Sequence, residues 1–137
     1  MDQKVLDFLK NERVCSLAVI MPDGTSHSAA MYFSLDPTQN SIYFLTPKSS
    51  HKCQAVANDK VASASIAVGF SEVNMITSQL KGSLRLASKN TLSQVKSVYF
   101  AKYPDSRKYD SPHSANLVFE VLSWKYINHK TEETITS

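Results

Sequence analysis

The chain has 137 residues, of which 42% are hydrophobic and 20% are charged. These values are typical of one globular domain with a single core. No stretch approaches the ~20 consecutive apolar residues of a membrane-spanning helix, so we expect no membrane association. The N-terminal sequence MDQKVLDFLKNERV lacks the continuous apolar segment of a secretory signal, which makes a cytoplasmic location the expectation.

The positive charges are spread along the chain. The net charge is +3, and the 15 basic residues run from Lys4 to Lys130 without forming a cluster. The aromatic pairs at 32–33 and 43–44 would suit base stacking in a barrel that binds single-stranded nucleic acid, but that function needs basic residues clustered beside them. We therefore expect no nucleic-acid partner.

Glycine and cysteine positions exclude several further classes of site. The three glycines, Gly24, Gly69 and Gly82, are too far apart for a glycine-rich nucleotide-binding loop. Cys15 and Cys53 are also far apart and form no CxxC pair, so we expect reduced, buried thiols rather than a disulfide framework or a zinc site. The chemistry must therefore lie elsewhere.

The predicted elements follow from periodicity and from turn and cap residues. In chain order they are a helix over 3–11 capped by Asp2, strands over 14–21, 28–35 and 41–46, a helix over 50–58, strands over 61–68 and 75–88, a helix from the TLSQ capping box at 91–94 to Tyr103, a loop over 104–115 and a strand over 116–127. This pattern predicts a mainly β fold, a six-stranded antiparallel barrel with short flanking helices. We expect one domain over 1–128 and a frayed polar tail over 129–137.

Two of these strands carry specific expectations. The strand over 75–88 alternates most cleanly, and Gly82 in its middle predicts a bulge or a close approach of another backbone. In the last strand, Trp124 is expected to share one face with Leu122 and Tyr126, in the core or in a subunit interface.

The segment LTPKSSHKCQAVANDKV, residues 45–61, concentrates polar groups where a strand meets a helix. Thr46 ends the strand, and Ser49, Ser50, His51 and Lys52 open the helix. Hydroxyls, an imidazole and an ammonium group at a helix N-terminus are suited to binding a phosphate. The alternative is that a serine only caps the helix while the lysines lie in water.

The order of the elements favours the phosphate interpretation. The segment GTSHSAAMYFSLDPTQNSIYFLTPKSSHKCQAVANDKVASASI, followed by SQLKGSLRLAS and VFEVLSWKYIN, resembles the pyridoxamine 5'-phosphate oxidase-like family of FMN-binding split β-barrels. The resemblance extends over residues 4–128. It implies a six-stranded antiparallel split β-barrel that forms a homodimer, with FMN at the interface.

The resemblance also implies roles for particular residues. Thr46, Ser50 and Lys52 would hold the FMN phosphate, and Gln79 would contact the edge of the flavin. His51 occupies a position where the founding oxidase type has an arginine and makes a weaker phosphate partner. The implied function is that of an FMN-binding oxidoreductase acting on a small-molecule substrate, with no catalytic residue nominated. Trp124 would alternatively lie beside the flavin ring.

Other positions depart from the founding oxidase. On the strand that carries a phosphate-binding arginine in that enzyme, this chain has Ala29 or Ala30, with only His27 nearby. Bidentate arginine contacts are strong, so their loss weakens the expected anchoring. The tail KYINHKTEETITS has no counterpart of the arginine-rich end that holds pyridoxal phosphate. We therefore expect no pyridoxamine phosphate oxidase activity.

The main alternative is a non-catalytic binding module on the same fold. It would hold haem, with His113 or His27 as the axial ligand, or another cofactor, or none. The four histidines, His27, His51, His113 and His129, show no metal-binding spacing, and no metal site is expected.

Overall fold

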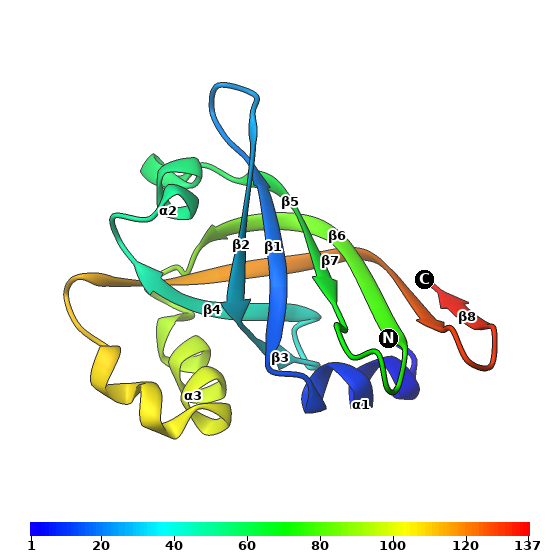
Figure 1. Cartoon of the computed structure of the whole chain (residues 1–137). Helices are drawn as coiled ribbons and strands as arrows, with labels where there is room; N and C mark the ends of the chain where they lie inside the picture. The colour runs from blue at the N-terminus through cyan, green and yellow to red at the C-terminus, as the bar shows by residue number, and fades with distance from the viewer.

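The computed structural model describes all 137 residues, and its strands form one curled antiparallel sheet, a split barrel (Figure 1). The strand order is β2-β1-β5-β6-β7-β4-β3, and β8 pairs with β7. The strands are β1 (Val14–Ile20), β2 (Ser26–Tyr32), β3 (Ser34–Asp36), β4 (Ser41–Pro47), β5 (Ala62–Val68), β6 (Ile76–Leu86), β7 (Ser114–Asn128) and β8 (Glu133–Thr136).

Three α-helices and two 3-10 helices flank the sheet. They are α1 (Gln3–Asn11), α2 (His51–Ala55), η1 (Ala57–Asp59), α3 (Leu92–Lys102) and η2 (Pro104–Tyr109). Asp2 caps α1 as predicted, because its carboxylate accepts the Lys4 amide at 2.8 Å. None of the helices is long and apolar enough to cross a membrane.

Most of the core fills the concave side of the sheet. Its largest members, including Phe33, Phe44, Leu80 and Phe119, are fully buried. A smaller cluster lies between the sheet and α3, where Tyr43 packs with residues of that helix. The expected TLSQ capping box at the start of α3 is wrong: Thr91 makes no cap hydrogen bond, and the Gln94 amide donates instead to Asp36 at 3.3 Å.

The sheet has eight strands rather than the predicted six, partly because the strand expected over 28–35 is divided. β2 pairs with β1, whereas β3 pairs with β4, so the chain changes partner at Phe33. The Phe33 amide donates to the Arg13 carbonyl at 3.2 Å, which extends the β1–β2 pairing by one residue, and the buried Tyr103 hydroxyl shares its hydrogen between the Arg13 and Phe33 carbonyls. The break therefore depends on a residue far away in the sequence.

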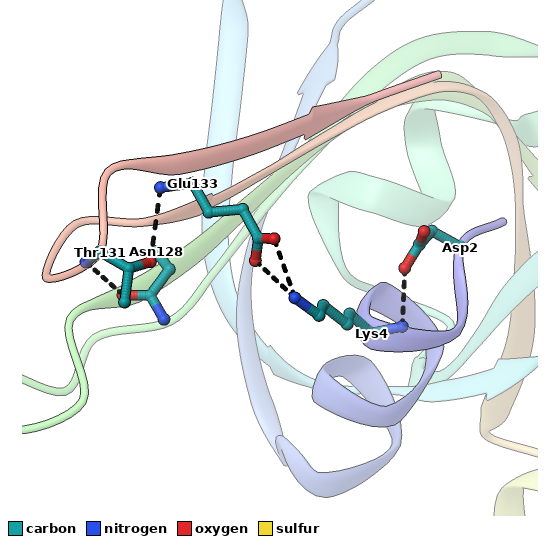
Figure 2. Close-up of polar contacts among 5 residues, drawn as sticks. All are labelled: Asp2, Lys4, Asn128, Thr131 and Glu133. Atoms are coloured by element: carbon teal, nitrogen blue, oxygen red, sulfur yellow. Dashed lines mark hydrogen bonds and ion pairs between the residues drawn. The ribbon is translucent and has the colours of Figure 1, made fainter.

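The predicted frayed tail is also wrong, because β8 pairs with β7 over Lys125–Asn128. Figure 2 shows what holds it. The Lys4 ammonium contacts both carboxylate oxygens of Glu133, at 2.8 and 2.9 Å, which ties the hairpin to α1. In the turn, the Asn128 side chain accepts the Thr131 amide, as Figure 2 shows, and also the Lys130 amide.

A β-bulge lies where β6 meets β7, as Gly82 predicted. Gly82 pairs with Val121 and Lys81 pairs with Ser123, so Leu122 is an extra residue on β7. A Cβ atom on Gly82 would lie 1.9 Å from the Glu120 carbonyl oxygen, so only glycine fits the close approach.

This bulge reverses the inward face of β7. Phe119 and Val121 point into the core before it, and Tyr126 does so after it, while Leu122 is 70% exposed. The prediction that Leu122 shares a face with Trp124 and Tyr126 is therefore wrong. Trp124 is half-buried against the edge of the core.

Candidate functional site

Thr46 lies at the end of β4 and is 4% exposed. Its hydroxyl forms no hydrogen bond within the chain, although it borders a cavity of about 410 Å³. A nearly buried hydroxyl beside a cavity is well placed to bind a ligand, because it loses hydrogen bonds to water without gaining any from the protein.

Ser50 is the N-cap of α2, and its hydroxyl oxygen accepts the Cys53 amide at 3.4 Å. Ser50 therefore caps the helix, and whether it also binds a ligand is a separate question. The hydroxyl hydrogen is still available for a ligand. α2 has only five residues, shorter than the predicted 50–58, so side chains rather than the helix N-terminus must provide most of any attraction for an anion.

Lys52 is the unusual residue of this junction, because its side chain is almost entirely covered, at 7% exposed, while its ammonium still reaches solvent and forms no ion pair and no side-chain hydrogen bond. Burial lowers the pKa of its ammonium group. Lysine is seldom buried without a partner, since an ammonium group strongly favours water. The site therefore has an uncompensated positive charge.

His51 lies against His27 of β2, with the ring centroids 4.9 Å apart and the planes tilted by 50°. Both rings border a polar hollow of about 470 Å³ next to the β1–β2 turn. The resemblance expects phosphate-binding arginines near these two positions. The structure places two imidazoles together there instead.

Gln79 lies apart from this group within one chain. It is exposed on β6, and its cross-strand partners are Ala67 and Lys125. β7 separates β6 from β4, which carries Thr46. The predicted site residues from 46 to 52 therefore form one junction, whereas Gln79 belongs to the outer face of the sheet.

The cavity beside Thr46 contains functional candidates that the sequence analysis missed. They lie mostly on β2, α3 and the segment after α3, and include Tyr32, Tyr99, Ser106 and Tyr109. His113, named above as a possible haem ligand, lines the same cavity. The segment over 104–115 was predicted to be a loop, but part of it forms η2, whose residues line one side of the cavity. The aromatic spacing in VYFAKY was the available signal, and it did not show which side chains would face a cavity.

An unpaired amide lies next to this cavity. The Nδ2 atom of Asn116 is fully buried and has no hydrogen-bond partner. Asn116 is the cross-strand partner of Leu45, which lines the cavity. Buried donors are nearly always paired, so this amide is an exception, but Asn116 itself does not line the cavity.

The family model described as pyridoxamine 5'-phosphate oxidase matches residues 1–128. The chain belongs to this family. Two relatives, UPF0306 proteins from two strains of Campylobacter jejuni, are each 28% identical over 134 residues, which cover 94% of this chain and 90% of theirs.

Solved structures share the fold. A haem binding protein from Mycobacterium smegmatis has a TM-score of 0.76 at 13% identity, covering 95% of this chain. This chain spans 54% of that protein's length. A Clostridium acetobutylicum protein related to general stress protein 26, of the pyridoxinephosphate oxidase family, has a TM-score of 0.71 at 12% identity, covering 100% of this chain and 96% of its own.

Proposed function

We propose that this protein binds FMN and acts as an oxidoreductase on a small-molecule substrate. The observation that carries the proposal is the largely covered Lys52, whose ammonium has no carboxylate partner, at the junction that also presents the hydroxyls of Thr46 and Ser50. A phosphate is the natural partner of such a set, because it offers negative charge to the ammonium and acceptor oxygens to the hydroxyls. The residues present therefore fit the phosphate end of FMN.

The proposed roles divide between charge and hydrogen bonding. Lys52 would neutralise the phosphate, and Thr46 and Ser50 would donate hydroxyl hydrogens to it. His51 and His27 would lie beside the phosphate, near the positions where the founding oxidase type has arginines. Bound FMN would supply hydride or electron transfer, while the protein binds and orients it. No side chain is assigned as a proton donor. The free thiols of Cys15 and Cys53 suit the proposed cytoplasmic setting.

We place Gln79 in the site through a homodimer. Its sheet face includes a hollow of about 340 Å³ lined partly by Ala18, Ser65 and Lys81. Leu122 lines the same hollow and is 70% exposed, so association would remove its apolar surface from water. A second copy against this face would contribute Gln79 to an FMN bound at the interface.

The test is an FMN titration followed by flavin fluorescence, together with an absorption spectrum after gel filtration. Lys52→Met removes the charge and keeps most of the aliphatic packing, and exposed Lys48→Met is the matched control. We expect Lys52→Met to weaken FMN binding by ~10-fold or more, the loss of one charge-assisted contact, and Lys48→Met to change it by less than ~2-fold. Equal effects of the two variants, or no FMN binding at all, would refute the proposal.

A non-catalytic haem-binding module is the second candidate, favoured by the position of His113. This residue lines the Thr46 cavity, whereas His27 lies against His51 with the rings tilted. The similarity to the mycobacterial haem binding protein concerns the fold alone, and it gives a further reason to test haem binding. A Soret band after haem addition that is lost in His113→Ala but kept in His129→Ala would support this function.

A further inference from the structure

A second cleft, of about 310 Å³, lies next to the Thr46 cavity and shares Tyr32, Ser106 and Tyr109 with it. Its lining includes three cations and one carboxylate, namely Arg13, Lys102, Lys108 and Asp105. None of these four takes part in either ion pair of the chain. The cleft therefore has an excess of positive charge without internal neutralisation.

Arg13 is held in place by its backbone and by aromatic rings. Its carbonyl accepts hydrogen bonds from the Phe33 amide and from the buried Tyr103 hydroxyl, the latter at 3.0 Å. Its guanidinium lies 4.8 Å from the ring centroid of Tyr103 and 5.8 Å from that of Tyr32. None of its N–H groups donates to the protein, so a positioned fork of donors is left for a ligand.

Lys102 supplies the second charge from the last residue of α3. Its half-buried ammonium donates to the Glu12 carbonyl and lies 4.4 Å from the ring centroid of Phe33. A structural role at the helix C-terminus would stabilise the charged form. Burial and the charge of Arg13 instead lower the pKa of Lys102 to about 8, so the contacts with the Glu12 carbonyl and the Phe33 ring compensate the charge only in part.

We propose that the Arg13–Lys102 cleft binds an oxyanion, the carboxylate or phosphate group of a small molecule, between the guanidinium and the ammonium. An oxyanion would accept hydrogen bonds from both groups and neutralise their mutual repulsion. Lys108, which lies over the Tyr109 ring, would add charge at the rim. This site does not depend on FMN, because it uses none of the residues at the β4–α2 junction.

The proposed site has a defined pH dependence. Lys102 is charged below about pH 8, so oxyanion affinity is highest there and falls as the ammonium loses its proton. The groups that face it are Arg13, Glu12, Cys15 and, across the cleft, Asp105 and Lys108. Burial raises the pKa of Cys15 to about 12, so its thiol stays neutral in this range.

The test is calorimetric titration with sulfate and with benzoate at constant ionic strength, because neither probe changes its charge between about pH 7 and about pH 9.5. Arg13→Gln and Lys102→Met are each expected to weaken binding ~10-fold or more at the lower pH. Lys10→Met, at an exposed position on α1, is the control and should change it less than ~2-fold. Lys102→Arg should keep its affinity at the higher pH, where the wild type loses it.

Two results would overturn the inference: wild-type affinity in Lys102→Met, or a pH dependence that Lys102→Arg does not remove. FMN titration of Arg13→Gln separates the two proposals. Normal FMN binding with lost sulfate binding supports the cleft as an independent site. Parallel loss of both would show that the cleft is not separate, whereas failure of FMN binding in the wild type would leave the oxyanion result unaffected.

Discussion

Replacing Gly82 by alanine tests the bulged crossing of β6 and β7. The added Cβ would lie 1.9 Å from the Glu120 carbonyl oxygen and 3.0 Å from both the Glu120 carbonyl carbon and the Phe119 ring. Ordinary carbon–oxygen contacts are ~3.3 Å, so one backbone must move by roughly 1.4 Å. Overpacking costs ~1–3 kcal/mol. Because the obstacle is backbone in the sheet interior, we expect the upper end, ~3 kcal/mol.

Gly24→Ala is the matched control, because it adds the same methyl group at a position with a different constraint. Gly24 has φ +86° but no atom within 4 Å of a Cβ, so the change should cost only the left-handed conformation, ~1–2 kcal/mol. Urea unfolding should show a lower midpoint for Gly82→Ala with an unchanged slope, and thermal unfolding a decrease of ~10 °C. A Gly82→Ala protein as stable as Gly24→Ala would refute the close approach.

Three further predictions concern single contacts. Ser50→Ala should lower the free energy of unfolding by ~1 kcal/mol through loss of the α2 cap, measured by urea unfolding; no change would mean the cap contributes nothing. Lys102 should add to stability as the pH rises from about 8 to 9.5, because its pKa is near 10.5 in the unfolded chain and about 8 in the folded one, so the unfolded chain binds more protons. The free energy of unfolding of the wild type relative to Lys102→Met should therefore rise over this range, and a constant difference would contradict the assignment. Lys4→Gln should speed hydrogen exchange of the β8 amides at low salt, because it removes the ion pair with Glu133. The effect should be smaller at high salt, or at a pH above the pKa of Lys4, which Glu133 raises. Unchanged exchange would show that β7 alone holds β8.

Local patterns predicted much of the secondary structure and one end of the candidate site. The Asp2 cap of α1, the turn glycine Gly24, the alternation of β6 and the polar residues from Thr46 to Lys52 all depend on neighbours within a few positions. Periodicity and capping act over the same short distance, so the sequence alone displays them. The family resemblance added the split form of the barrel, the homodimer and FMN, and it favoured the phosphate interpretation over simple capping.

Long-range pairing decided the rest. The partner change at Phe33, the reversed inward face after Leu122 and the added strand β8 all depend on segments far apart in the chain. The oxyanion cleft is the clearest case, because Lys102 meets the carbonyl of Glu12 across a separation of 90 residues. A residue's charge can be read from the sequence, but whether that charge is buried and unpaired is determined only when the strands have closed and their register is set.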